Sequence, residues 1–192
     1  MHQPEKKSAS AQKLSLLGLI LLGPLAAFSE PSEPAIDAPP AHSAPGCGDN
    51  GSVTSSLYGS IEAQINWSAD EVTCDSMPRP NNQGVRLRFV GEVAGERLAV
   101  IIALPALRPG DTAVEIPSNV TATVEGSGRF FSTPNLDSCW TEVISQTKLG
   151  DDDTYAIEGI LLCVAPLGEI NGDAAISIPE LSFSSILNWN RK

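Results

Sequence analysis

The chain contains 192 residues, of which 42% are hydrophobic, 18% charged and 5% aromatic, and its formal net charge is -11. The hydrophobic fraction is too high for a wholly disordered chain, and 15 prolines and 16 glycines are far fewer than a collagen-like sequence contains. Binding to nucleic acid by charge is excluded as well, because 23 acidic residues outnumber 12 basic ones and phosphate neutralisation needs clustered Lys and Arg.

The first 29 residues have the pattern of a secretory signal peptide. Three lysines precede an apolar run over residues 14–28, which is shorter than the ~20 residues that a membrane-spanning helix needs. Small residues around Ser29 suit a signal peptidase. We therefore predict a secreted or periplasmic protein from which residues 1–29 are removed, with no membrane insertion after that cleavage.

Residues 30–45 (EPSEPAIDAPPAHSAP) are rich in Pro, Ala and Ser and offer little to bury, which predicts a disordered tether. No second stretch of this kind follows in residues 46–192. A chain of that length buries on the order of 70% of its unfolded surface, which is enough for an independent core. We therefore predict a single domain over residues 46–192.

Apolar and polar side chains alternate with a period of two through this domain, as in β-strands with one solvated face. The pattern predicts strands at 53–67, 85–93, 98–104, 113–125, 129–132, 139–148, 154–165 and 173–187. Turn signals separate these segments. The sequence therefore predicts an antiparallel β-sandwich of seven or eight strands, with a β-barrel as the alternative.

Two of these strands are predicted to form a hairpin around Gly95-Glu96. Glycine at the first central position suits a two-residue type II′ turn. This turn places Val93 opposite Leu98 and aligns apolar residues along both strands.

The cysteines Cys47, Cys74, Cys139 and Cys163 are an even set in a chain predicted to be exported, which favours disulfides over thiols or metal ligands. A hairpin turn centred on Asp151 places Cys139 directly opposite Cys163. The predicted disulfides are therefore Cys139–Cys163 and Cys47–Cys74.

The same hairpin register makes further predictions along its two strands. It places Leu161 opposite Thr141, and Tyr155 opposite Thr147 near the turn.

The absence of histidine from the predicted domain excludes several kinds of active site. The only histidines, His2 and His42, lie in the predicted signal peptide and tether. This removes catalytic triads, histidine bases and histidine metal ligands. Carboxylates remain, and Glu142 and Glu158 are predicted to be near one another, although such residues usually form a solvated strand face. We expect no enzymatic activity, with a carboxylate-based glycan hydrolase as an alternative.

Four side chains are candidates for ligand binding: Arg86, Arg88, Trp67 and Trp140. The two arginines share one strand face and could grip an acidic ligand, or they could pair with acids on neighbouring strands. Trp67 and Trp140, together with Trp189 and Tyr58, could form a platform for a sugar ring, or they could belong to the core.

Two polar turns are candidates for a calcium site. Asp151 and Asp153 lie in an acidic turn that could supply oxygen ligands, although tight turns favour the same residues. The segment 169–180 (EINGDAAISIPE), through Asn171 and Asp173, resembles the calcium loop of EF-hands and dockerins. It departs from that pattern at Glu169, where Asp is expected, and where glycine is expected it has alanine.

A hairpin with an Asn171-Gly172 turn is the competing interpretation of this second segment. It places Leu167 opposite Ile176, and Ala165 opposite Ile178.

The sequence therefore predicts a secreted or periplasmic binding or structural module with two disulfides, no cofactor other than the calcium considered above, and an unknown protein or glycan as ligand. The long segment 68–84 is the predicted contact loop, because long loops on rigid sandwiches commonly carry binding. A carboxylate-based glycan hydrolase and a calcium-dependent adhesion domain are the alternatives. The oligomeric state is not predicted.

Overall fold

The computed structural model describes residues 46–79 and 84–190. The predicted signal peptide and tether lie outside the described residues, so both stay predictions, as does the assignment of residues 46–192 to a single domain.

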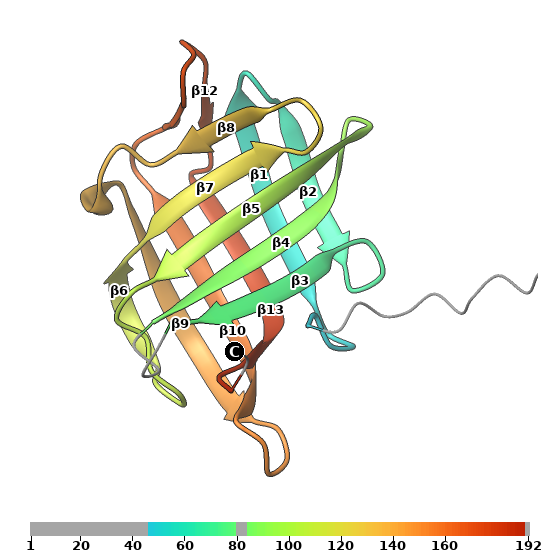
Figure 1. Ribbon diagram of the computed structural model, residues 1–192, viewed down its shortest axis with the longest axis vertical. Helices are drawn as coiled ribbons and strands as arrows, with labels where there is room; N and C mark the ends of the chain where they lie inside the picture. Colours follow the sequence, from blue (N-terminus) through green and yellow to red (C-terminus); the bar gives the residue numbers. More distant parts are fainter. Residues whose placement is uncertain (1–45, 80–83, 191–192) are drawn as a thin grey trace, which may run out of the picture. The chain divides into compact units, whose positions relative to one another are not determined.

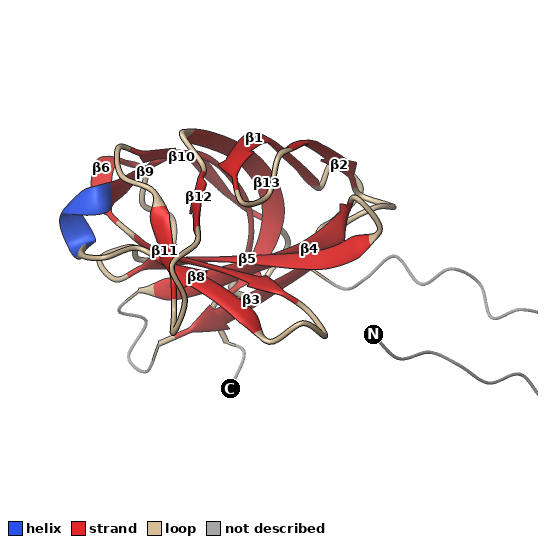
Figure 2. Ribbon diagram, turned by 90° about the horizontal axis from the view of Figure 1, so that it is seen from above, coloured by secondary structure: helices blue, strands red, loops and turns tan. Residues whose placement is uncertain are grey.

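The described residues form thirteen strands in two antiparallel layers, seen from two directions in Figures 1 and 2. Sheet A contains, in spatial order, β2 (Ala63–Ser68), β1 (Ser52–Gly59), β13 (Glu180–Asn188), β10 (Thr154–Cys163), β9 (Cys139–Lys148) and β6 (Ala113–Pro117). Sheet B contains β3 (Thr73–Pro78), β4 (Val85–Val93), β5 (Glu96–Leu104), β7 (Asn119–Val124), β8 (Arg129–Ser132), β11 (Leu167–Glu169) and β12 (Ala175–Ser177). One 3-10 turn, η2 (Leu136–Ser138), precedes β9.

Strand β1 joins the two layers. Its residues 52–55 pair with β13 in sheet A, whereas Tyr58 and Gly59 pair with β12 in sheet B. At the other ends of the strand order, β3 and β6 are not paired with each other within the described residues. The structure is therefore an open, sandwich-like fold and not the alternative barrel.

The predicted all-β sandwich is confirmed, but the number of strands exceeds seven or eight because three predicted strands are interrupted and because β3 and β11 lie outside the predicted strand ranges. The segment 53–67 forms β1 and β2, 113–125 contains β6 and β7, and 173–187 contains β12 and β13. Leu57 and Ala63 are partners across the β1–β2 turn. The side chains of both residues face the core, so the apolar alternation continues through the turn. The alternation alone therefore does not show that the strand ends there.

The prediction of a loop over residues 68–84 is wrong at its centre, where β3 pairs with β4. Cys74 and Ser76 of β3 are buried and face the core. Because Ser76 is polar, the sequence TCDSMP does not display the apolar alternation by which the other strands were predicted.

The core lies between the two layers. The rings of Phe89 on β4 and Phe183 on β13 meet there, with their centroids 5.5 Å apart. Trp67 extends from β2 toward sheet B, where its Nε1 donates a hydrogen bond of 3.0 Å to the carbonyl of Glu92. The indole ring lies so close to Gly91 that a Cβ atom at that position would overlap it.

The hairpin of β4 and β5 is confirmed, but its predicted register is wrong by two residues. The turn is Ala94-Gly95, with φ angles of 52° and 83°, as a type I′ turn requires. Val93 therefore pairs with Glu96, and Leu98 pairs with Gly91. A slip of two residues keeps every side chain on its face of the sheet, so the apolar pattern is equally satisfied by both registers.

Both predicted disulfides are confirmed. Cys47 and Cys74 have Cα atoms 4.9 Å apart, and Cys139 and Cys163 have Cα atoms 4.1 Å apart. Disulfides of this kind persist in oxidising environments, which indicates an extracellular or periplasmic location.

The β9–β10 register is as predicted beside the Cys139–Cys163 disulfide, where Leu161 faces Thr141. Nearer the turn it differs by one residue, and Tyr155 faces Lys148 instead of Thr147. The extra residue in β9 is Ile144, since Val143 and Ser145 pair with successive residues of β10. The predicted pairing assumed one constant register along the hairpin and therefore could not include this β-bulge.

The predicted hairpin around Asn171-Gly172 is confirmed. Leu167 of β11 pairs with Ile176 of β12, and Asn171 has a positive φ of 64° in the turn. The expected pair of Ala165 with Ile178 lies beyond the ends of both strands.

We predict that Gly91→Ala lowers the free energy of unfolding by about 1–3 kcal/mol, because the added methyl group occupies the space of the Trp67 ring. Denaturation in urea would measure the change. Gly168→Ala is the matched control: a Cβ atom there meets no atom within 4 Å, so its effect should stay within about 0.5 kcal/mol. Equal losses at both positions would contradict the close packing of Trp67 on Gly91.

The type I′ turn predicts that Ala94→Asn raises the free energy of unfolding by up to about 1 kcal/mol, since Asn tolerates positive φ better than Ala. Glu96→Asn, at the start of β5, should bring no gain because Asn is disfavoured in strands. Urea denaturation of the two variants distinguishes the registers. A gain at Glu96 alone would favour the Gly95-Glu96 turn.

Candidate functional site

The outer face of sheet A carries a set of short polar side chains. Strands β2, β1 and β13 lie side by side, and their outward positions are occupied by hydroxyl and amide groups. Thr54 stands between Asn66 and Ser182, and Ser52 stands between Ser68 and Ser184. Three strands from the two ends of the domain sequence thus build one polar surface.

A hollow of about 430 Å³, which we call the β1–β2 hollow, lies on this surface. The side chains that line it include Thr54, Ser56, Tyr58, Gln64, Asn66 and Glu180. Tyr58 is 51% exposed, so about half of this aromatic residue is open to solvent beside these polar groups.

Hydrogen bonds fix part of this lining. Ser56 Oγ donates to Gln64 Oε1 at 2.9 Å, and Ser55 Oγ donates to the carbonyl of Glu180 at 2.6 Å. Among the described residues, the side chains of Thr54 and Asn66 make no hydrogen bond within the chain. These groups can therefore bind a ligand without giving up an internal partner.

A second hollow of about 370 Å³, the β10–β13 hollow, lies farther along β13. Ala156, Glu158, Ser184 and Ile186 form its floor, and the turn 47–50 and Leu149 also line it. The turn is close to the floor, since a Cβ atom at Gly48 would lie 2.9 Å from Ile186 Cγ1.

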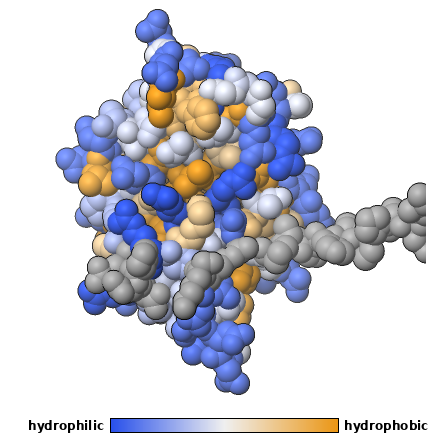
Figure 3. Space-filling view, in the orientation of Figure 1, coloured by the Kyte–Doolittle hydropathy of each residue, from blue (hydrophilic) through white to orange (hydrophobic). Residues whose placement is uncertain are grey.

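The predicted arginine pair lies on the other layer, on the outer face of sheet B, which is shown in Figure 3. Arg88 forms an ion pair with Glu125, which also accepts a hydrogen bond of 2.9 Å from Arg97. Arg86 is exposed, between Met77 and Ala103 on the adjacent strands. Arg88 thus pairs with an acid that directly follows β7, the strand next to β5, much as the alternative interpretation expected. Neither arginine lines either hollow.

The structure separates the aromatic side chains that were considered together as a sugar platform. Trp67 is only 6% exposed and belongs to the core. Trp140 is half-buried on β9, opposite Leu162. Trp189 is buried, and its Nε1 donates to Gln146 Oε1 at 3.3 Å. Tyr58 is the aromatic residue of this set that lines the β1–β2 hollow.

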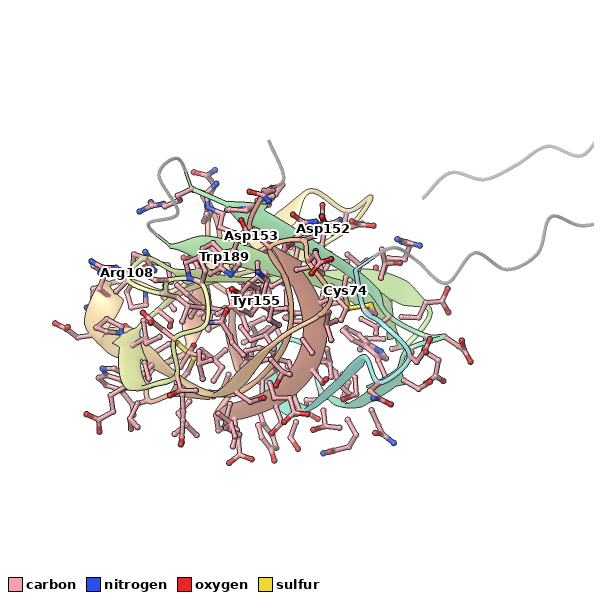
Figure 4. All side chains as sticks on the ribbon, turned by 90° about the horizontal axis from the view of Figure 1, so that it is seen from below. Cys74, Arg108, Asp152, Asp153, Tyr155 and Trp189 are labelled. Atoms are coloured by element: carbon pink, nitrogen blue, oxygen red, sulfur yellow. A yellow bond between two sulfur atoms is a disulfide. The ribbon has the colours of Figure 1, made fainter. Side chains whose placement is uncertain are left out.

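The two candidate calcium turns lie at opposite ends of the sandwich in Figure 1. Asp151 and Asp153 lie in the β9–β10 turn, where Asp153 Oδ1 is 3.9 Å from Lys148 Nζ and the Asp153 carbonyl accepts a 2.8 Å hydrogen bond from Trp189 N. Figure 4 views this end and labels Asp153 together with Trp189. Asn171 and Asp173 lie in the β11–β12 turn.

Within residues 46–79 and 84–190, no three acidic, cysteine or histidine side chains are grouped as a metal ion would require. Calcium binding stays a prediction from the sequence.

Glu169, the first residue of the calcium-loop pattern, is engaged by Arg129. Arg129 Nε donates to Glu169 Oε1 at 2.7 Å. This hydrogen bond lowers the pKa of Glu169, while desolvation of the carboxylate acts in the opposite direction. The pair ties β8 to β11 within sheet B and occupies the carboxylate that a cation would need.

The acidic pair considered for hydrolysis lies on the outer face of sheet A. Glu158 stands opposite Ser145 and accepts a long hydrogen bond of 3.5 Å from its hydroxyl, and Glu142 stands opposite Ile160. Of these two carboxylates, Glu158 lines the β10–β13 hollow and Glu142 lines neither hollow.

Comparisons of the chain with protein-family models, with curated proteins and with solved structures find no match. The helical content of the described residues includes no segment long and apolar enough to cross a membrane.

Sequence reasoning did not find the hollows, although part of the signal was present. The polar members of the alternating run, such as Thr54, Gln64 and Asn66, were assigned to a solvated strand face, which is correct. Glu180 was noticed only within the calcium-loop pattern. Its position beside Thr54 and Tyr58 depends on the pairing of β1 with β13, which are separated by more than one hundred residues.

The lowered pKa of Glu169 predicts a pH-dependent contribution to stability. Because the folded-state pKa lies below the unfolded value of about 4.3, the contribution is present above that value and is lost as the pH falls through the folded-state pKa. Glu169→Gln should therefore be less stable than the wild type at pH 7, and the difference should close in acid. Urea denaturation from pH 7 to pH 3 would measure it.

The matched control for this prediction is the same substitution in an Arg129→Gln background. Since the partner is already absent there, Glu169→Gln should add little pH dependence. A difference from the wild type that stays constant with pH would contradict the role of the ion pair.

Proposed function

We propose that this chain is an exported, non-catalytic binding module that recognises a glycan through the β1–β2 hollow. The observation that carries the proposal is the composition of that hollow, which is lined by hydroxyl, amide and carboxylate groups together with an exposed tyrosine. The two disulfides support action in an oxidising environment outside the cytoplasm.

The chemistry of the lining matches that of a sugar. A sugar hydroxyl both donates and accepts hydrogen bonds, and so do the hydroxyl of Thr54 and the amide of Asn66. The carboxylate of Glu180 can accept two hydrogen bonds from adjacent sugar hydroxyls, and such charge-assisted bonds are stronger than neutral ones. The exposed ring of Tyr58 offers an apolar face to the C–H groups of a sugar ring.

The hollow is also pre-organised for binding. Its groups stand on strands of a packed sheet, and hydrogen bonds already hold Ser55 and Ser56. Binding then immobilises few additional side chains, so less of the interaction energy is lost to ordering.

The number of carboxylates supports binding without cleavage. Hydrolysis of a glycosidic bond requires two carboxyl groups on opposite sides of the scissile bond. Among the described residues that line the β1–β2 hollow, Glu180 is the one acidic residue. A sugar held there meets a single carboxylate.

The test is to measure glycan binding by the wild type, Tyr58→Ala and Phe130→Ala. A glycan array identifies bound sugars, and titration calorimetry then gives their affinities. Tyr58→Ala should weaken binding by roughly tenfold or more, which corresponds to about 1.4 kcal/mol. Phe130, which is 45% exposed on the other layer, is the matched control, and its replacement should leave the affinity unchanged.

Three results would overturn the proposal. The first is no binding of any glycan by the wild type. The second is equal weakening by both substitutions, which would place the site elsewhere. The third is the release of shorter oligosaccharides from a bound glycan, which would make the protein a hydrolase.

A further inference from the structure

The two hollows lie on the same face of sheet A and share one strand as their floor. Outward positions of β13 alternate from Glu180, which lines the β1–β2 hollow, through Ser182 to Ser184 and Ile186, which line the β10–β13 hollow. At about 3.3 Å per residue, the distance from Glu180 to Ile186 is roughly 20 Å. A site of that length is longer than one sugar ring.

We infer that the two hollows bind different sugars of one uncharged, linear polysaccharide that lies along β13. This inference rests on the proposed function and extends it from a single sugar site to a chain of several sugars.

The surface between the hollows is low enough for a chain to cross. Ser182 pairs with Thr54 on one side and with Ile160 on the other, while Ser184 pairs with Ser52 and Glu158. The side chains along the centre line are thus serines, which leave room above the sheet and offer hydroxyls to a ligand.

The charge of the linings argues against an anionic ligand. Glu180 lines one hollow, and Asp49 and Glu158 line the other. In the part of the chain that the structure describes, no lysine or arginine lines either hollow. A sulfated or uronic acid chain would be repelled by these carboxylates and would find no cation to pair with.

The β10–β13 hollow offers a mixed surface that suits a second sugar. Ala156 and Ile186 supply an apolar floor for the C–H face of a ring, and Asn50 and Glu158 supply hydrogen-bonding groups beside it. The turn 47–50 forms a fixed wall, because Cys47 is covalently bound to Cys74.

The experiment measures affinity against chain length with the exported protein in which both disulfides are formed. Neutral linear oligosaccharides of two to six sugars, such as the cello-, xylo-, laminari-, malto- and chito-oligosaccharide series, are titrated calorimetrically. For the series that binds, the affinity of the hexasaccharide should exceed that of the disaccharide by about tenfold or more, because it gains contacts in the second hollow.

Two variants locate this gain in the β10–β13 hollow. Ser184→Tyr fills the floor of the hollow and should reduce the affinity for the hexasaccharide to that for the disaccharide. Thr73→Tyr, on the outer face of edge strand β3, is the control and should change the affinity for neither oligosaccharide. Glu158→Gln should weaken only the longer chains, and Glu142→Gln, on the same face but outside the hollows, serves as its control. Glu158→Gln preserves the side-chain shape and keeps the test valid should Ser184→Tyr fail to fold.

The outcomes separate this inference from the proposed function. Equal affinity for the disaccharide and hexasaccharide would overturn the extended site but leave a single sugar site intact. A length-dependent gain that Ser184→Tyr and Glu158→Gln do not reduce would also overturn it. Binding of charged glycans alone would overturn this inference but not the proposed function. Binding of no glycan would overturn both, as would exclusive binding of a cationic peptide with strong salt dependence.

Discussion

The change of partner along β1 determines how the rest of the molecule is arranged. This strand pairs with β13 over its first half and with β12 at Tyr58 and Gly59, so it belongs to both layers. Gly59 permits the change: its φ is +101°, and a Cβ atom there would lie 2.6 Å from the carbonyl oxygen of Ala175. Because β1 lies between β2 and β13, the same pairing brings hydroxyl and amide groups from distant segments onto one face.

The sequence was sufficient for features that depend on near neighbours along the chain. The alternation of side chains predicted most of the strands, and the predicted pairing of Cys139 with Cys163 is confirmed. The turn is not centred on Asp151, because Tyr155 faces Lys148, and the bulge at Ile144 restores the predicted register beside the disulfide. The sequence was insufficient where two strand registers satisfy the same alternation of side chains. A slip of two residues at Ala94-Gly95 keeps every side chain of the hairpin on the same face of the sheet. The bulge at Ile144 changes the β9–β10 register, but nothing in the residue types around it marks its position.

The candidate site was less predictable than the fold, because its members come from strands that are remote in sequence. The aromatic residues were predicted as a sugar platform from their residue type alone. In the structure, Trp67 packs in the core, whereas Tyr58 lines the β1–β2 hollow. Arg88 was predicted as a candidate for binding an acidic ligand. Its ion pair with Glu125 depends on the position of β7 beside β5. Residue type indicates which chemistry a side chain offers, whereas strand order decides what it meets.

The way the folded part begins has a mechanical consequence. Gly46 accepts a hydrogen bond from Ile186 N in sheet A, and its neighbour Cys47 is covalently joined to Cys74 in sheet B. A pulling force that enters through the preceding residues is therefore shared by both layers before it reaches β1. The covalent link carries load into β3 directly, so tension is not focused on the strand that supports the polar face. A force applied at the N-terminal side of the domain would thus act on β13 and β3 as well as on β1, the strand that joins the layers.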